Sequence, residues 1–186
     1  MYAILEHSFS QREGDEQRCV MSFPPAVAPI KVGIFRLINN VAFEPIINRI
    51  QDSFVSAAIA VKVDSSSGTI GRRYARADEI GIPFGVTIDF QTLIDGTVTV
   101  RDRDTMSQIR VPSGSLVKLI NNLVTGEVAW ANALKCFTVV NAGGDEAGEE
   151  TDGKSSDKNV AAVSPIVVET FTRGSFSRPN PAFSSK

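Results

Sequence analysis

Residues that build disulfide frameworks, metal sites and many catalytic centres are scarce in this sequence. Its 186 residues include only two cysteines, Cys19 and Cys136, and one histidine, His7. Two cysteines far apart and without metal-ligand spacing indicate reduced thiols rather than a disulfide framework or a zinc site. Because the single histidine has no placed partner, the sequence offers no Ser/His/Asp or Cys/His arrangement. We therefore expect no catalytic residue and no metal in this chain.

Long apolar runs are absent as well. No run approaches the roughly 18 residues that a membrane-spanning helix requires, so we expect no membrane segment. The opening sequence, MYAILEHSFSQREGDEQR, contains an apolar stretch of about four residues followed by acids, unlike a signal peptide. These absences indicate a cytoplasmic protein and leave an organellar form open.

Neither sign of charge dominates, since 19 basic and 21 acidic side chains give a net charge of −2. Residues 1–140 contain 14 side chains of each sign and are neutral. Their arginines nevertheless form two groups, one of Arg72, Arg73 and Arg76 and one of Arg101, Arg103 and Arg110. Local arginine groups in a neutral domain suit a small RNA site better than a long duplex track.

Runs rich in β-branched and aromatic residues predict strands. They cover residues 30–38, 58–64, 84–90 and 97–104, and residues 107–111 form either a further short strand or the start of the next segment. Asp95 followed by Gly96 predicts a hairpin turn between the strands at 84–90 and 97–104.

Helical patterns lie between the strands. Residues 1–12 are expected to be the end of a helix, and residues 12–18 a charged loop. Proline at position 45 begins a helix with one apolar stripe, formed by Ile46, Ile47, Ile50, Phe54, Ala57 and Ala58. The next helix is capped by Thr69, turns Ile70, Tyr74 and Ala77 inward and Arg72, Arg73 and Arg76 outward, and is closed by Gly81 and Pro83. A last helix presents Leu116, Leu119, Ile120 and Leu123 on one face.

This order of elements predicts an α/β fold, with an open, roughly five-stranded mixed sheet and about three flanking helices. Residues 139–186 are polar, acidic and rich in glycine and serine, which predicts a largely disordered tail. Its short apolar run, SPIVVETF, could dock as a strand, although a solvated tail is the preferred interpretation. The chain thus divides into residues 1–28, a domain at 29–138 and the tail.

Two long segments carry a resemblance to a known family. DSSSGTIGRRYARADEIGIPFGVTIDF (64–90) and TVTVRDRDTMSQIRV (97–111) closely resemble the anticodon-binding domain of eukaryotic-type glycyl-tRNA synthetases, which are class II enzymes. Residues 6–18 and 23–32 resemble the segment that joins this domain to the catalytic core. The resemblance covers residues 1–137 in order and implies the same five-stranded mixed sheet with three helices.

The resemblance also implies what the whole enzyme does. It activates glycine with ATP and magnesium, transfers the glycine to tRNA(Gly), and works as a homodimer. MYAILEHSF resembles the helix that follows the third ATP-binding motif, so residues 1–28 are expected to be a remnant of the catalytic core and a connector. The three motifs themselves are absent, so we expect this chain alone to be inactive and to hold no cofactor. Its expected partners are tRNA(Gly) and the catalytic core of the same polypeptide.

Glycine anticodons carry two cytosines, and this fact indicates the residue types that read them. A carboxylate accepts from the cytosine amino group, while arginine donates to the acceptors of the same base edge. The chain offers this mixture twice. Asp64 and Ser65 end one predicted strand opposite the arginines at 72–76, and RDRD (101–104) ends another.

Alternation along the strand places Arg101 and Arg103 on one face and Asp102 and Asp104 on the other. We predict that Arg101 or Arg103 donates to an anticodon base and that Asp64 or Asp102 accepts from a cytosine amino group. The alternative is that RDRD forms salt bridges with neighbouring strands or with the helix at 72–76, and both can hold.

Other residues remain open between two roles. Arg72 and Arg73 either contact phosphates or lie on a solvated helix face. Phe43 is either a core residue or reaches the anticodon loop, and Trp130 packs on the sheet edge in preference to stacking on a base.

A different class of function is also open: a protein-interaction or dimerisation module, as in the accessory subunits of a mitochondrial DNA polymerase.

Overall fold

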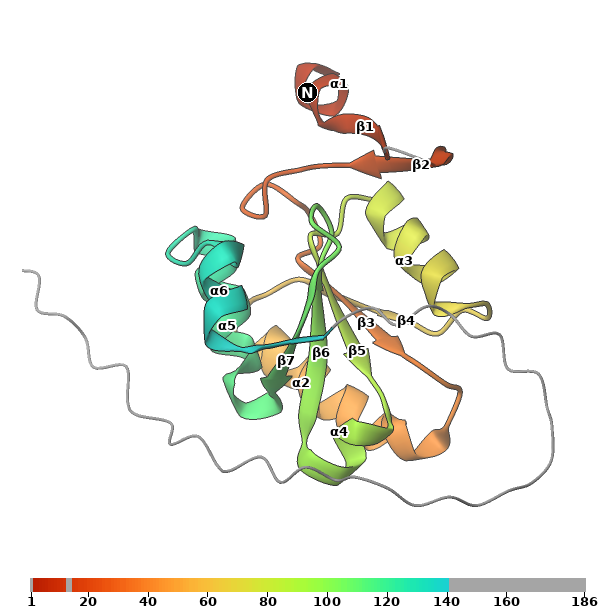
Figure 1. Ribbon diagram of the computed structural model, residues 1–186, viewed down its shortest axis with the longest axis vertical. Helices are drawn as coiled ribbons and strands as arrows, with labels where there is room; N and C mark the ends of the chain where they lie inside the picture. Colours follow the sequence, from red (N-terminus) through yellow and green to blue (C-terminus); the bar gives the residue numbers. More distant parts are fainter. Residues whose placement is uncertain (1, 13–14, 141–186) are drawn as a thin grey trace, which may run out of the picture. The chain divides into compact units, whose positions relative to one another are not determined.

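One mixed sheet organises the residues that the computed structural model describes, 2–12 and 15–140 (Figure 1). Its strands are β3 (Val32–Arg36), β4 (Val61–Asp64), β5 (Phe84–Ile88), β6 (Thr97–Asp102), β7 (Gln108–Pro112) and β8 (Thr138–Val140). The strand order is β4-β3-β5-β6-β7-β8. Strands β4, β3 and β5 are parallel, and each later strand is antiparallel to its neighbour. The mixed α/β class is confirmed, with six strands in place of about five because β8 was not predicted.

Helices cover both faces of the sheet (Figure 1). On one face α2 (Glu44–Ser56), α5 (Ser113–Thr125) and α6 (Trp130–Cys136) pack on the main core. On the other face α3 (Ile70–Glu79) packs around Phe35, Ala77 and Ile82. The buried residues predicted for these helices are confirmed: Ile47, Ile50, Phe54, Ala77, Leu116, Leu119, Ile120 and Leu123. Ala57 and Ala58 are exposed, because the helix ends at Ser56 and Ala58 takes a left-handed conformation with φ of 57°.

The first residues depart from the prediction. A short helix, α1 (Tyr2–Ser8), gives way to β1 (Phe9–Arg12), which pairs antiparallel with β2 (Asp15–Met21). The expected charged loop at 12–18 is therefore mostly strand. The charged residues at 12–18 show no strand pattern, so the strand β2 and its apolar end, where Val20 is buried, were not predicted. What the sequence predicts for residues 141–186 lies outside the described residues.

The connection between β5 and β6 also differs from the expected turn. The two strands pair antiparallel as predicted, but a helix, α4 (Phe90–Asp95), separates them. Asp89 caps this helix by accepting from the Thr92 backbone N–H at 3.0 Å, and Thr92 Oγ1 accepts in return from the Asp89 N–H at 3.1 Å. Gly96, with φ of 69°, ends the helix in the left-handed region. The Asp-Gly pair is thus a helix terminus, and the reciprocal cap went unrecognised.

Phe43 and Trp130 both pack in or against the hydrophobic core. Phe43 is fully buried. Trp130 begins α6, stacks on Phe84 at a ring-centroid distance of 6.3 Å and donates from Nε1 to Ser107 Oγ at 2.7 Å. The packing interpretation of Trp130 is therefore confirmed.

A buried carboxylate, Asp78, joins the β1–β2 hairpin to the sheet. Arg12 of β1 donates from Nη2 to Asp78 Oδ2 at 2.8 Å. Arg101 of β6 donates from Nη1 to Asp78 Oδ1 at 3.1 Å and from Nη2 to Oδ2 at 3.3 Å. The side chains of Arg12, Asp78 and Arg101 are 12%, 6% and 8% exposed. Two arginines from distant parts of the chain therefore depend on one acid.

Neutralising Asp78 should weaken the whole domain. In Asp78→Asn both arginines lose the carboxylate that they share, and an uncompensated buried charge of this kind costs about 3–5 kcal/mol. Urea denaturation of the wild type and the variant measures this loss. Glu79→Gln is the matched control because Glu79 is the next residue and is exposed. A free energy of unfolding equal in Asp78→Asn and the control would contradict the assignment.

The lowered pKa of Asp89 implies that the stability of the domain depends on pH. Burial raises the pKa of Asp89, but hydrogen bonds from Arg110 and Thr92 and the Arg110 charge together hold it below its ordinary value. A carboxyl group with a lowered folded pKa contributes stability that is complete above its unfolded pKa and is lost as the pH falls through the folded value. Asp89→Asn keeps a capping side chain without the charge. The free energy of unfolding should therefore fall less between about pH 7 and about pH 3 in the variant than in the wild type.

Urea titrations across this range provide the measurement. Asp52→Asn, at an exposed position of α2, is the control and should follow the wild type. Parallel pH profiles for the wild type and Asp89→Asn would show that the charge of Asp89 does not contribute.

Candidate nucleic-acid interface

The direction of the strands separates the two predicted groups of site residues. Asp64 ends β4 beside Phe35 of β3, which in turn lies beside Thr87 of β5. Asp102 ends β6 beside Phe84, the first residue of β5. Because β6 runs antiparallel to β5, its end lies at the edge where the parallel strands begin. Asp64 and the 101–104 run, each predicted at the end of a strand, therefore lie at opposite edges of the sheet and do not form one site. We call the edge with Asp64 the carboxyl edge.

At the carboxyl edge, Arg73 gathers the ends of two strands. It donates from Nη2 to the Asp64 carbonyl at 2.6 Å, from Nη1 to the Arg36 carbonyl at 2.6 Å and from Nε to Asp64 Oδ2 at 3.3 Å. Its side chain is 5% exposed, so the outward placement predicted for Arg73 is wrong. The physical reason is spacing: Arg73 lies three residues after Ile70 and four before Ala77, on the helix face that they share. Arg72 is exposed, as predicted.

Asp64 is held as a carboxylate. Its Oδ1 accepts from the Ser66 backbone N–H at 2.8 Å and from the Ser66 hydroxyl. Burial raises the pKa of Asp64, but the two bonds from Ser66 and the charge of Arg73 outweigh burial and keep the pKa below its ordinary value. Ser65, beside it, is exposed. Asp64 is therefore a positioned hydrogen-bond acceptor that stays ionised at neutral pH.

A groove of about 440 Å³ runs between β4 and α3 and includes these groups in its walls. Its lining combines the apolar Phe35, Ile80 and Ile82 with a polar set, Lys62, Asp64, Ser65, Ser66, Arg73, Arg76 and Glu79. An apolar surface beside a carboxylate, hydroxyls and cations offers one side to the face of a flat ring and the other to its polar edge.

At the opposite edge, the three predicted residues are bonded within the domain. Arg101 lies over the Tyr74 ring at 4.7 Å in addition to its bonds with Asp78. Asp102 Oδ2 accepts from the Thr105 N–H at 2.9 Å, and Thr105 Oγ1 donates to the same oxygen at 2.8 Å. Burial raises the pKa of Asp102 despite the bonds from Thr105.

Arg103 is the most deeply buried of them, at 1% exposure. It donates to both carboxylate oxygens of Asp104 and to the carbonyls of Gly81 and Phe23. The expected alternation of arginines and acids fails here, because β6 ends at Asp102 and Arg103 binds the adjacent Asp104. The salt bridge expected as the alternative is present for Arg101, which pairs with Asp78 of the helix that contains residues 72–76, whereas Arg103 pairs within the run.

Sequence reasoning missed two features of the carboxyl edge. Arg36 pairs with Glu44 at 2.5 Å, and Arg110 pairs with Asp89 at 2.5 Å. Large apolar residues follow both β3 and β5 at this edge and are exposed. The signal was available in RLINN (36–40), where the apolar run continues beyond the strand and into an asparagine pair.

Within residues 2–12 and 15–140, no group of three or more His, Cys, Asp or Glu side chains could hold a metal ion. None of the helices in the same part of the chain is long and apolar enough to cross a membrane.

Known proteins similar to this chain are glycine–tRNA ligases. The chain is 51% identical over 138 residues to the enzyme of Drosophila melanogaster and 51% identical over 135 residues to that of Caenorhabditis elegans. These alignments cover 74% and 72% of this chain but 18% of each relative. A relative named glycine–tRNA ligase 1, mitochondrial, from Saccharomyces cerevisiae is 40% identical over 152 residues, which are 82% of this chain and 22% of the relative. The chain thus spans about a fifth of the length of these relatives.

These relatives confirm the resemblance to glycyl-tRNA synthetases, and they give no support to the polymerase-accessory alternative. The family comparison agrees with them. Residues 26–123, more than half of the 186, match the family described as anticodon binding domain. The groove and the parallel strand ends at the carboxyl edge lie within this matched segment. The chain therefore belongs to the anticodon binding domain family.

Proposed function

We propose that this chain recognises the anticodon of tRNA(Gly) as part of a glycine–tRNA ligase. The names and the 51% identity of the fly and nematode relatives support this assignment. The whole protein would attach glycine to tRNA with ATP and magnesium and act as a homodimer, and we assign no step of that reaction to a residue of this chain.

The cytoplasm is the compartment we propose, since Cys19 and Cys136 are both free thiols.

The groove between β4 and α3, which includes Asp64 and Ser65 of the carboxyl edge, is the observation that carries the proposal for the site. In open α/β sheets, ligands bind outside the carboxyl ends of the strands, where the chain passes to opposite sides of one strand. Here the chain passes from β3 to β4 on one side and from β4 across β3 to β5 on the other, so the order reverses between β3 and β5. The groove lies next to this point, beside β4. The edge combines the ionised Asp64 with the exposed Ser65.

Each residue of this edge has a distinct role in the proposal. The Asp64 carboxylate accepts a hydrogen bond from a cytosine amino group, and Ser65 contacts the same base or its neighbour. Arg72, which is exposed, contacts a phosphate of the loop. Arg73 positions Asp64 through its bonds to the Asp64 carbonyl and to Oδ2, donates its third bond to the Arg36 carbonyl, and is not free to contact RNA.

The roles predicted for Arg101, Asp102 and Arg103 stay predictions. All three residues are at least nine-tenths buried, and each makes hydrogen bonds within the domain. Base contact would require these bonds to open. We therefore propose a positioning role for them, in which Arg101 binds Asp78 and the other two fix the turn after β6.

Binding to glycine tRNA tests the function. Fluorescence anisotropy of the full chain with tRNA(Gly), and with the same tRNA carrying a swapped anticodon, should show tighter binding to the first. The salt dependence should be similar for both, because phosphate contacts are shared. Equal binding to the two RNAs, or none, would defeat the proposal for this chain.

Asp64→Asn should relax the choice of base. An amide donates to the O4 atom that uracil carries in place of the cytosine amino group, so preference for cytosine should fall by about 1–3 kcal/mol. Anisotropy with anticodon stem-loops that differ by one C-to-U change provides the measurement. Asp52→Asn, on α2, is the control and should keep the wild-type preference. Unchanged preference in Asp64→Asn would exclude this carboxylate as the reader.

A further inference from the structure

The carboxyl edge carries a second surface that the groove does not include. Six large apolar side chains are exposed there, in two segments: Leu37, Ile38 and Val41 after β3, and Phe90, Leu93 and Ile94 in α4. Their exposed fractions run from 43% for Leu93 to 84% for Val41. We call these six residues the apolar platform. Grouped exposed apolar residues of this kind mark binding surfaces in soluble proteins.

Backbone bonds and caps hold the two segments of the platform in place. The Leu37 N–H donates to the Ile88 carbonyl at 2.9 Å, which ties the loop after β3 to the end of β5. Asn40 Oδ1 accepts from the Ala42 N–H at 2.9 Å and caps the short helix η1 (Val41–Phe43). The platform is therefore built on fixed backbone at the ends of two adjacent strands.

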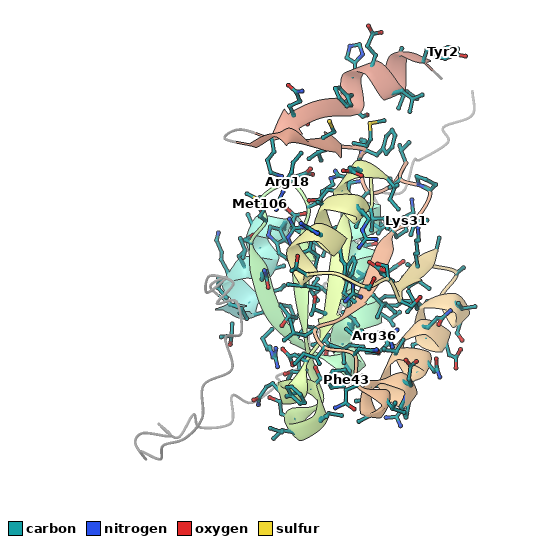
Figure 2. The ribbon with its side chains drawn as sticks, turned by 90° about the vertical axis from the view of Figure 1, so that its right-hand side faces the viewer. Tyr2, Arg18, Lys31, Arg36, Phe43 and Met106 are labelled. Atoms are coloured by element: carbon teal, nitrogen blue, oxygen red, sulfur yellow. The ribbon has the colours of Figure 1, made fainter. Side chains whose placement is uncertain are left out.

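Phe90 is the aromatic member of the platform and is fixed at one edge. The buried Phe43 contacts it edge to face, with ring centroids 5.6 Å apart and an interplanar angle of 62°. Phe90 remains 49% exposed in spite of this contact. Figure 2 shows Phe43 at the same end of the molecule as Arg36, away from Met106 and Arg18. A held ring with an exposed surface is what a stacking partner requires.

The platform adjoins the groove through Arg36. Arg36 directly precedes Leu37, and its carbonyl accepts from Arg73, the residue that also binds Asp64. Strands β4 and β5 lie on either side of β3, and two strand spacings are about 10 Å. One RNA loop can therefore contact both surfaces at once.

Charge at this edge favours bases over phosphates on the platform. Arg36 is paired with Glu44, and Arg110 with Asp89, so their charges are compensated. The uncharged side chains Asn39, Asn40 and Gln91 lie in the same two segments. A nucleobase has an apolar face and an uncharged polar edge, whereas a phosphate requires an unpaired cation.

We propose that the apolar platform stacks an unpaired base of the anticodon loop, with Phe90 as the principal stacking residue. This inference rests on the proposed function. The base in question is a neighbour of the cytosine that Asp64 reads, so the platform adds affinity without choosing the cytosine. Stacking tolerates any base, because each has a π face.

Fluorescence of 2-aminopurine tests the proposal on the full chain. The probe replaces the loop nucleotide on either side of the two cytosines in a glycine anticodon stem-loop, and its emission falls when it stacks. Wild type and Phe90→Trp should quench the probe. Phe90→Ala should not quench it and should bind about 5- to 100-fold more weakly. Phe9→Ala is the matched control, since Phe9 of β1 is also half exposed, at 53%.

A second pair of variants guards against loss of folding. Ile94 is 79% exposed, so Ile94→Ser should weaken binding without changing the thermal midpoint. Val55 of α2 is 62% exposed, and Val55→Ser should change neither the thermal midpoint nor binding. If the wild type discriminates between anticodons but Phe90→Ala and Ile94→Ser bind like it, the platform has another occupant and the proposal is overturned. If the wild type does not discriminate, the proposed function fails first.

Discussion

The carboxylate of Asp78 receives hydrogen bonds from Arg12 and Arg101, which belong to strands almost ninety positions apart in the chain. Arg12 also donates to the carbonyl of Arg103 at 3.1 Å, so the same contact reaches the turn after β6. Because these charges are buried, each depends on the others for its solvation. This shared acid makes the N-terminal hairpin, α3 and β6 parts of one structure. It also commits Arg101 of β6 to the interior, and leaves recognition of an external ligand to other residues.

Strand direction determines which residues are available to recognise an external ligand. The three parallel strands end together, and their ends place Arg36, Asp64 and Asp89 along one edge of the sheet. The chain then reverses through α4, so the polar end of β6 comes to the opposite edge. At the carboxyl edge, the hydrogen bonds from Arg73 keep Asp64 ionised. Ser65 is exposed at the same edge, and Phe90, which follows β5 two strands from β4, is half exposed. A carboxylate reader and a stacking surface on one edge form a coherent site for an unpaired RNA loop, and we base the proposed recognition of the anticodon on it.

Local patterns predicted most of the fold, and long-range pairing limited the prediction of the site. The stripe of Ile47, Ile50 and Phe54 and the Thr69 cap depend on neighbours within a few residues, so their spacing was sufficient. Arg73 and Arg101 looked like surface residues because arginine usually is. Their burial depends on Asp64 and Asp78, which the folded chain alone brings to them. The helix α4 was missed for a related reason: the Asp89–Thr92 cap lies in a β-branched run, and the following Asp-Gly pair suits both a hairpin turn and a helix terminus.

The central claim is that the carboxyl edge, and not the end of β6, faces the RNA. Amide chemical shifts of the isotope-labelled chain, followed during titration with a glycine anticodon stem-loop, test it most directly. The largest changes should fall in residues 37–40, 64–66 and 90–94. Changes confined to residues 102–107 and the β1–β2 hairpin would place the RNA at the other edge and contradict the account.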